Sequence, residues 1–445
     1  MLPVVTPAQM KVVDATATDP QEVLIQRAGH AVANVAIRML GGSYGRRVNV
    51  IAGKGNNGQD GLIAARLLQR RGVRCKIYDP NASALAGADL VIDAAYGTGF
   101  RDTWQPPPQP RCPVLAVDIP SGIDGLTGAD NGSLQAQRTV TFGALKPGLL
   151  LEPGASRAGH VEVAGLGLEI PNPKCHLITN QDLAEPLSRR TATDHKWTNA
   201  LRIIGGSPEM VGAAQLAAHG ALRAGAGMVV VSSPSTDILL HGLPTEAVTR
   251  TLSDPEWVSQ VLADLERFTG LLIGPGLGSD PRTLSEAAKL IERAPIPVIV
   301  DADGIAAIAA HPECVKNRQW PTVVTPHDGE FKKLTGASPS HDRCADVRNA
   351  AKECVVLLKG PTTLVASPDG DLIFIRSGDE RLATAGSGDV LAGIIGALIN
   401  YPPAHLATAA AAQWHGQAAQ LGEPDMTASD LPSLLQPARS EMLSS

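Results

Sequence analysis

The sequence predicts an α/β protein of two domains, each built from a parallel sheet with helices on both faces (three-layer α/β/α). The chain has 445 residues, which is long enough for two or three domains with separate cores. Apolar residues make up 44% of it and aromatic residues only 3%. The cores must therefore consist mainly of Ala, Val, Leu and Ile, a mix that suits helices packed on a parallel sheet. Short apolar runs that alternate with helical patterns, in two separate series, indicate the same architecture.

The first series lies in the N-terminal part of the chain. Each apolar run ends in a turn rich in Gly, Asn, Asp or Pro, as strands of an open α/β sheet do. We predict strands at 47–53, 90–95 and 114–118, with a helix at 62–71 after the first strand. The carboxyl ends of such strands meet at one edge of the sheet, where these folds bind their ligands.

A stretch with little helical periodicity follows the first series. It contains four prolines: Pro153, Pro171, Pro173 and Pro186. We place the domain boundary near 172–178, which gives domains at 1–174 and 175–445.

The second series predicts another parallel sheet. Its strands are expected at 201–205, 228–231, 271–274, 298–301, 322–325 and 355–359. A helix at 211–224 is closed by Gly225 and Gly227, which stand where glycines end helices. The two halves differ in sequence, so we do not infer an internal duplication.

Charge and composition exclude several classes of partner. The 38 basic and 44 acidic residues give a net charge of −6, which does not favour nucleic-acid binding. The most apolar late run, 390–399, is about half the length of a membrane span, and no signal pattern precedes the first domain. The six cysteines have no C-x-x-C or metal-ligand spacing, which indicates reduced thiols. We expect a cytoplasmic protein that binds neither nucleic acid nor membrane.

The strongest chemical signal is the glycine-rich turn at 385–389, Ala-Gly-Ser-Gly-Asp, before an apolar helix. Backbone amides of Gly386, Ser387 and Gly388 at that helix N-terminus would point at an anion. Asp389 would then stand where a carboxylate can take a proton from a hydroxyl beside a phosphate. Taken alone, the turn is equally compatible with a plain helix start, because glycine-rich turns before helices are common.

Three other strand-end loops favour the phosphate interpretation. His327 and Glu330 follow one strand, Lys359 begins a loop after another, and the glycines of 274–278 follow a third. Lysine and hydroxyl groups bind phosphate oxygens, and bare backbone leaves room for a flat ligand. Four such loops at one sheet edge predict a phosphoryl-transfer site.

The motifs TPHDGE at 325, KGPTT at 359 and GSGDVLAG at 386, with GGS at 205 and GAGM at 225, resemble ADP- or ATP-dependent NAD(P)H-hydrate dehydratases over about residues 178–435. That family is ribokinase-like, and the resemblance implies phosphate transfer from ADP or ATP to a hydrated nicotinamide ring, followed by phosphate elimination. It implies nucleotide binding by Lys359, Gly360, Pro361, Thr362, Thr363 and Gly388. Asp389 would be the catalytic base, in a substrate pocket lined by Ala213, Gly276, Gly278 and His327. A Mg²⁺ ion is expected beside the phosphates.

Two stretches depart from that family's pattern. His195-Lys196-Trp197 stands where the family has His-Lys-Gly, which would alter a flexible lid. The stretch 378–382, Gly-Asp-Glu-Arg-Leu, replaces a Gly-Asn-Pro-Gly-Met-like sequence and would alter how the far end of the substrate is held. We expect neither departure to touch the phosphate turn.

The N-terminal part carries its own polar motif, GKGNNGQDGL at 53–62. Asn56, Asn57 and Asp60 follow the first strand, Asp93 ends the second, and Asp118 ends the third. An Asx-rich turn that caps the helix is the alternative, but the motif is more polar than a cap requires. Three strand ends with carboxylates indicate a binding crevice.

These three motifs resemble the NAD(P)H-hydrate epimerase (YjeF N-terminal) domain, a Rossmann-like fold, over about residues 5–170. The resemblance implies interconversion of the R and S hydrates at ring carbon 6, with Asp118 as the proton-transfer carboxylate. Asn56, Asn57, Gly58, Gln59 and Asp60 would bind substrate, and Asn57, Asp93 and Ser121 would hold K⁺. Gln59 replaces the family's glycine. Lys146 is either a further polar contact or an exposed lysine after a strand.

The favoured hypothesis is a bifunctional NAD(P)H-hydrate repair enzyme, a homo-oligomer that binds NADHX, NADPHX and ADP or ATP. The residues leave the choice between ADP and ATP open, although fused bacterial forms of the family generally use ADP. One alternative is a ribokinase-like kinase for a small alcohol, which would leave a stable phosphorylated product. A second alternative makes the N-terminal domain a binding module without catalysis, which the presence of Asp60, Asp93 and Asp118 disfavours.

Overall fold

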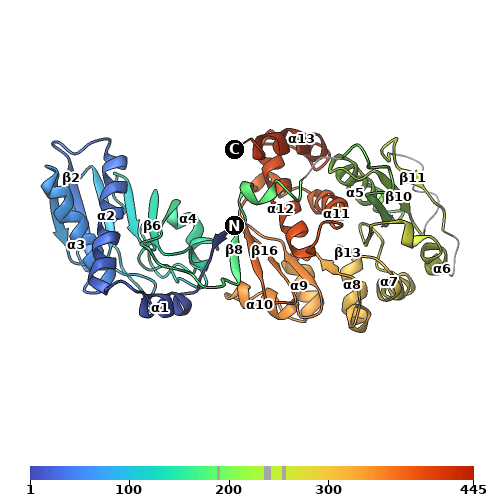
Figure 1. Cartoon of the computed structure of the whole chain (residues 1–445), viewed down its shortest axis with the longest axis horizontal. Helices are drawn as coiled ribbons and strands as arrows, with labels where there is room; N and C mark the ends of the chain where they lie inside the picture. The colour runs from blue at the N-terminus through green and yellow to red at the C-terminus, as the bar shows by residue number, and fades with distance from the viewer. Residues whose placement is uncertain (188–190, 235–241, 253–256, 445) are drawn as a thin grey trace. The chain divides into compact units, whose positions relative to one another are not determined.

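The computed structural model describes residues 1–187, 191–234, 242–252 and 257–444. The chain forms two compact units, Leu2–His176 and Met1 with Leu177 onward (Figure 1). Strand β8 (Cys175–Leu177) spans the point where the chain passes from one unit to the other. Among the described residues, no helix is both long and apolar enough to cross a membrane.

The N-terminal unit contains a parallel sheet in the order β3-β2-β4-β5-β6-β7. Its strands are β2 (Arg47–Ala52), β3 (Arg74–Tyr78), β4 (Leu90–Ala94), β5 (Val114–Val117), β6 (Arg138–Phe142) and β7 (His160–Ala164). The strands predicted at 47–53, 90–95 and 114–118 are therefore central neighbours, and β3, β6 and β7 complete the sheet. This order places the ends of β2, β4 and β5 side by side.

Helices α2 (Gln21–Leu40) and α3 (Asn56–Arg70) pack together on one face of this sheet (Figure 1). The opposite face is covered in part by Trp104 and Leu134 from the loops that follow β4 and β5. The short helices α1 (Pro7–Ala15) and α4 (Gly154–Ala158) complete the unit. Helix α3 begins six residues before the expected 62, because extended Gly55 caps it directly after β2. The polar motif Asn56–Asp60 therefore forms the first turn of a helix.

The C-terminal unit contains a larger sheet in the order β17-β16-β15-β14-β13-β12-β9-β10-β11. The strands are β9 (Ala200–Ile204), β10 (Met228–Ser232), β11 (Val248–Thr249), β12 (Gly270–Ile273), β13 (Val298–Val300), β14 (Thr322–Val324), β15 (Val355–Leu358), β16 (Thr363–Ala366) and β17 (Leu372–Ile375). From β15 to β11 the pairing is parallel, as predicted. The antiparallel hairpin β16–β17 was not predicted. Its turn is closed by a hydrogen bond from Gly370 N to Ser367 O, within the turn sequence Ser-Pro-Asp-Gly.

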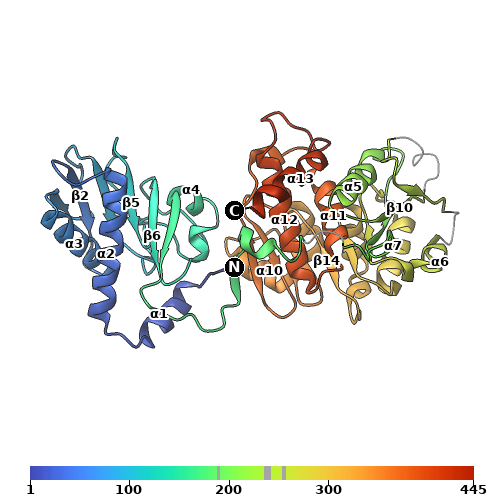
Figure 2. The ribbon, with the colours of Figure 1, turned by 45° about the horizontal axis from the view of Figure 1, so that its top comes forward.

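Helices cover both faces of this sheet, which confirms the three-layer prediction for this part of the chain (Figures 1 and 2). One layer consists of α5 (Val211–Arg223), α11 (Ser387–Leu398), α12 (Ala404–Gln420) and α13 (Leu431–Met442). The other consists of α6 (Trp257–Leu262), α7 (Pro281–Arg293), α8 (Asp303–Ala310), α9 (Asp328–Thr335) and α10 (Arg343–Ala350). Alternate strand residues, such as Leu201 and Ile203, pack under the first layer.

Close approach of α5 and α11 holds the phosphate turn against the sheet. A Cβ atom on Gly393 would lie 2.0 Å from the carbonyl oxygen of Ala217, so only glycine fits there. We expect Gly393→Ala to force the helices apart and to lower the free energy of unfolding by roughly 1–3 kcal/mol. Urea unfolding measures this, with Gly212→Ala as the control, because a Cβ there would have no heavy atom within 4 Å beyond its chain neighbours and the backbone of its own helix. An unchanged urea midpoint for Gly393→Ala would contradict the packing argument.

Candidate active sites

A cavity of about 960 Å³ opens at the carboxyl edge of the N-terminal sheet. Its lining includes side chains from the first turn of α3 and from the ends of the neighbouring strands. Those expected from the sequence are Asn56, Asn57, Asp60 and Asp118. Two residues of the motif behave differently, because Gly58 is buried against Gly53 and Gln59 is exposed outside the lining.

Asp118 and Lys146 form an ion pair at the bottom of this cavity. Lys146 Nζ donates to Asp118 Oδ1 at 2.6 Å, to Thr141 Oγ1 at 2.8 Å and to Phe142 O at 2.8 Å. All three ammonium hydrogens are thus used, and the Lys146 residue is only 1% exposed. The interpretation of Lys146 as an exposed lysine is therefore wrong. Its side chain is buried because Asp118, Thr141 and Phe142 supply three hydrogen-bond acceptors for the ammonium group.

Asp60 lies in the same cavity in a different environment. It is 5% exposed, and its Oδ1 atom is buried without a hydrogen-bond partner among the described residues. Burial and the nearby charge of Asp118 raise the pKa of Asp60 to about 8. The two carboxyl groups of this cavity thus differ in their environment. Asp118 is paired with a lysine, whereas Asp60 is mostly protonated near neutral pH.

The residues expected to hold an alkali cation are partly brought together. Ser121 donates to both oxygens of Asp93, from N to Oδ2 at 2.9 Å and from Oγ to Oδ1 at 2.6 Å. Asp93 is fully buried, and burial raises the pKa of its carboxyl group. Asn57 has both side-chain polar atoms buried without a partner among the described residues. Throughout the residues that the structure describes, no three His, Cys, Asp or Glu side chains form a group that could hold a metal ion.

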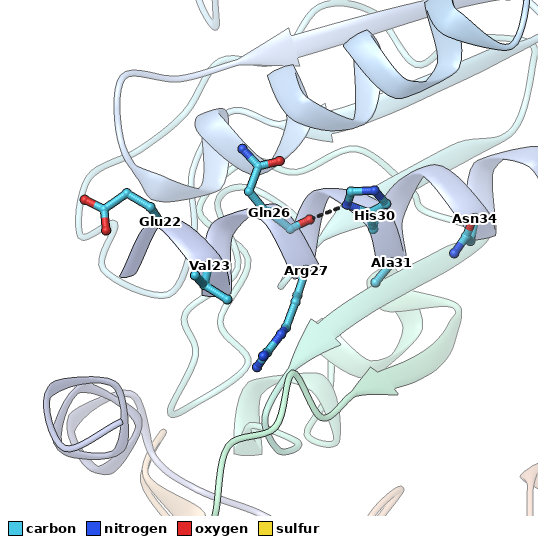
Figure 3. A pocket seen from close by; sticks show the side chains of 7 residues that line it. All are labelled: Glu22, Val23, Gln26, Arg27, His30, Ala31 and Asn34. Atoms are coloured by element: carbon cyan, nitrogen blue, oxygen red, sulfur yellow. Dashed lines mark hydrogen bonds between the residues drawn. The ribbon is translucent and has the colours of Figure 1, made fainter. Parts of the chain in front are cut away.

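A shallow hollow along α2 is lined by residues of that helix only (Figure 3). His30 Nδ1 lies 2.8 Å from Gln26 O, and Figure 3 shows Gln26 and Arg27 pointing to opposite sides of the helix. Arg27 is held by Asp19 at 2.6 Å and by the carbonyl of Leu166 at 2.7 Å. These polar groups serve local contacts, so the hollow is not a candidate active site.

The phosphate turn of the C-terminal unit forms as expected at the start of α11. Gly386 has φ 92°, a left-handed conformation that favours glycine, and it directly precedes the helix. A Cβ atom on Gly388 would lie 3.3 Å from Lys359 Nζ, so the lysine reaches the turn from the end of β15. Of the three amides predicted to point at an anion, that of Ser387 instead donates to Thr384 O at 3.4 Å. The N-terminus of α11 and the lysine ammonium still lie side by side, an arrangement that suits an anion.

Lys359 is held in place by acidic side chains from two other strand ends. Its Nζ donates to Asp301 Oδ1 at 3.0 Å and lies 3.6 Å from Glu330 Oε2. Thr325 Oγ1 donates to the same Asp301 oxygen at 2.7 Å. Burial opposes the charge of Lys359, but Asp301 and Glu330 outweigh it and raise the pKa of the lysine.

Asp389 follows Gly388 and lies among the same charged groups. Burial, then the charges of Asp301, Glu330 and Asp303, raise the pKa of Asp389 to about 7, while Lys359 opposes the rise. A carboxyl group that titrates near the working pH can both accept and return a proton. The geometry therefore places a carboxyl group with a raised pKa beside the N-terminus of α11 and Lys359.

The residues predicted to line the substrate pocket are connected to Asp303 on one side of Asp389 and to Glu330 on the other. A Cβ atom on Gly276 would lie 3.0 Å from Ala213 Cβ, and Gly278 N donates to Asp303 Oδ2 at 2.8 Å. On the other side, His327 Nε2 lies 3.6 Å from Glu330 Oε2.

The remaining loop residues of the nucleotide motif connect β15 to β16. Gly360 and Pro361 are exposed, and Thr362 is buried. Thr363 Oγ1 donates weakly to Gly360 O at 3.4 Å.

Comparison with known proteins gives the family. A family model described as NAD(P)H-hydrate dehydratase matches residues 201–439, and one described as YjeF-related protein N-terminus matches 21–86 and 76–148. The bifunctional NAD(P)H-hydrate repair enzyme of Moorella thermoacetica is 34% identical over 96% of this chain and 94% of its own length. The chain belongs to the family of bifunctional NAD(P)H-hydrate repair enzymes.

Solved structures agree with this family of repair enzymes in the C-terminal unit. The ADP/ATP-dependent NAD(P)H-hydrate dehydratase of Bacillus subtilis, co-crystallised with ATP and Mg²⁺, is 27% identical with a TM-score of 0.50. The match covers 60% of this chain and 98% of that one. A ribokinase-like protein of Enterococcus faecalis, 22% identical over 62% of this chain and 98% of its own, has a TM-score of 0.53 and shows the fold alone. The resemblances drawn from the motifs are thus confirmed.

Within this repair-enzyme framework, the sequence interpretation missed Asp301 and Asp303. Both belong to the Asp-Ala-Asp-Gly sequence that directly follows β13 and leads into α8, and Asp301 is 2% exposed. The signal was a strand end rich in Asp and Gly, of the kind already used for the other loops. These two aspartates belong to none of the motifs recognised in the sequence. Asp301 comes close to Lys359 only because β13, β14 and β15 are neighbours in the sheet.

The two departures from the repair-enzyme pattern lie in different places. Trp197 packs edge-on against Phe268 at 5.5 Å and under Arg267, at the amino ends of β9 and β12, far from the phosphate turn. The expectation that 378–382 leaves the turn untouched is wrong, because Ser387 Oγ donates to Leu382 O at 2.8 Å. The 3₁₀ helix Glu380–Leu382 ends only four residues before α11, so it lies against the turn.

Proposed function

We propose that the chain repairs hydrated NADH and NADPH with two sites. The N-terminal site would interconvert the R and S hydrates, and the C-terminal site would dehydrate the S form with ADP or ATP, which gives AMP or ADP and phosphate. The observation that carries the proposal is the assembly of Lys359, Gly388 and Asp389. A phosphate site with a carboxyl of pKa about 7 suits transfer to a hydroxyl group.

In the C-terminal site, Lys359, Gly360, Pro361, Thr362, Thr363 and Gly388 would bind the nucleotide. Asp389 would take the proton of the substrate hydroxyl as phosphate arrives, and elimination of that phosphate would restore the double bond of the ring. His327, Ala213, Gly276 and Gly278 would line the substrate pocket. The closeness of His327 to Glu330 and of Gly276 to Ala213 supports this grouping.

Magnesium is the expected companion of the nucleotide in this site. Mg²⁺ usually binds one or two carboxylates together with substrate phosphates, so a complete protein cage is not needed. Asp301 and Glu330 beside Lys359 fit that donor set. A bound ion would neutralise phosphate charge during transfer.

In the N-terminal site, Asp118 would transfer protons, and Asn56, Asn57 and Asp60, which line the cavity, would contact substrate. The ion pair with Lys146 supports the assignment of Asp118, since it fixes a charged carboxylate in a large cavity. Asn57, Asp93 and Ser121 would hold K⁺. The amide oxygen of Asn57, which has no hydrogen-bond partner within the described part of the chain, and the fully buried Asp93 fit an alkali cation.

The same proposal includes a homo-oligomer in the cytoplasm. The six cysteines show neither a C-x-x-C pair nor metal-ligand spacing in the sequence, a pattern typical of proteins in a reducing compartment.

An assay of both hydrate epimers with ADP and with ATP tests the proposed function. We expect NADH, seen by its near-ultraviolet absorbance, to return from the S epimer directly and from the R epimer after epimerisation. Comparison of the two nucleotides gives the preferred phosphate donor. A stable phosphorylated product without NADH would instead indicate a small-alcohol kinase and overturn the proposal.

A further inference from the structure

We propose that Asp60 is a second catalytic residue of the N-terminal site, which protonates the departing hydroxyl group of the hydrate while Asp118 accepts the proton of the incoming water. This inference rests on the epimerase part of the proposed function. It goes beyond the substrate contact expected of Asp60, because it gives the residue a chemical step.

The position of Asp60 supports this step. Asp60 comes from the first turn of α3 and lines the same cavity as Asp118, which follows β5. Its Oδ1 atom is buried and has no partner among the described residues, whereas the neighbouring carboxylate is bonded to Lys146 and Thr141. A buried polar atom without a partner costs free energy unless a ligand supplies the missing bond. The cavity is where that ligand would lie.

Charges around the cavity keep the two carboxyl groups in different states. Lys146 donates its three ammonium hydrogens to Asp118, Thr141 and Phe142, so none is left to bond Asp60. The other charged groups that line the cavity are Lys11, Asp14, Lys54 and Asp79. Burial, and then Asp118, raise the pKa of Asp60 to about 8. At neutral pH the cavity thus pairs a protonated acid with a carboxylate, the combination that acid–base catalysis needs.

The chemistry balances without a further reactant. Carbon 6 of the hydrate carries the hydroxyl group and is bonded to the ring nitrogen. Asp60 gives its proton to the hydroxyl oxygen, the carbon–oxygen bond breaks, and water leaves as the nitrogen lone pair forms a double bond to carbon 6. Water then adds to the opposite face, and its proton passes to Asp118. Return of one proton from Asp118 to Asp60 through solvent resets the site.

The test compares Asp60→Asn and Asp60→Glu in the full chain, without nucleotide so that the C-terminal site is idle. Initial rates of loss of pure R-hydrate are measured by chromatographic separation of the epimers. We expect Asp60→Asn to lower kcat by roughly 10²–10⁴-fold with little change in KM, and Asp60→Glu to keep a measurable part of the activity. The control is Glu169→Gln, the same carboxyl-to-amide change at an exposed residue of the same unit that lies outside the cavity lining, and we expect it to change kcat less than about threefold.

The pH profile separates a proton donor from a structural role. In the unaltered chain, kcat/KM should fall as pH rises through about 8, because Asp60 must be protonated to act. That falling limb should vanish in Asp60→Asn and persist, at a shifted pH, in Asp60→Glu. Full kcat in Asp60→Asn, or an unchanged falling limb, would overturn the inference. Circular dichroism and urea unfolding of each variant check that the N-terminal unit is folded, and S-hydrate dehydration checks the C-terminal unit. If the unaltered chain does not epimerise R-hydrate, the epimerase proposal fails, and the role of Asp60 fails with it.

Discussion

Replacing Asp389 with asparagine is expected to abolish the recovery of NADH from S-hydrate, with kcat reduced by roughly 10²–10⁴-fold or more. The asparagine side chain keeps the size of the carboxyl group but cannot take the hydroxyl proton. Nucleotide affinity should be kept or increased, because a negative charge beside the phosphates is removed. Steady-state rates and nucleotide titration by calorimetry measure the two effects. The control is Asp425→Asn, an exposed carboxyl of the same unit.

The pH dependence gives an independent check on Asp389. The unaltered site should gain activity as pH rises through about 7, because the base must lose its proton before it can act. The folded pKa lies above the unfolded value of 3.8, so the folded chain binds the extra proton between these pH values. Stability from this group therefore falls as pH rises from about 4 to about 7, and Asp389→Asn should unfold at higher temperature at pH 8. Full turnover in this variant would refute the role of Asp389.

The sequence predicted which strand-end loops of the C-terminal unit come together, because most of these loops follow parallel strands. His327, Glu330 and Lys359 follow the parallel strands β14 and β15, and the carboxyl ends of parallel strands share one edge. Gly388 instead lies in the first turn of α11, where the glycine-rich sequence before an apolar helix was the signal. Asp301 was missed because its role depends on β13 lying beside β14 in the sheet. Strand order is a tertiary property that one-dimensional periodicity does not contain.

Burial explains the other gaps between sequence and structure. Lys146 follows a strand, where lysines are mostly exposed, and only the folded edge shows that Asp118, Thr141 and Phe142 supply its acceptors. The β16–β17 hairpin was overlooked although Pro368, Asp369 and Gly370 form a recognisable turn. In both cases the local sequence was compatible with two structures, and tertiary contacts selected one.

Replacing Lys146 with methionine is expected to stop epimerisation and to lower the free energy of unfolding by roughly 3–5 kcal/mol. Methionine fills much of the same space but leaves the Asp118 carboxylate, 16% exposed in its side chain, without its cation. Removing one partner of a buried ion pair destabilises the protein by more than the pair stabilises it, because the remaining charge stays buried without a counter-ion. Urea unfolding and R-hydrate epimerisation measure the two losses. As the control, Lys76→Met removes an exposed lysine over the Tyr78 ring and should cost less than about 1 kcal/mol.

The double variant Lys146→Met/Asp118→Asn distinguishes the two roles of this ion pair. Removal of both charges ends the penalty of an unpaired carboxylate, so we expect much of the lost stability to return. Epimerisation should not return, because the proton-transfer group is then absent. Stability that stays as low as in Lys146→Met would show that the lysine stabilises the edge by packing and its bonds to Thr141 and Phe142. Restored epimerisation in the double variant would exclude Asp118 as the proton-transfer carboxylate.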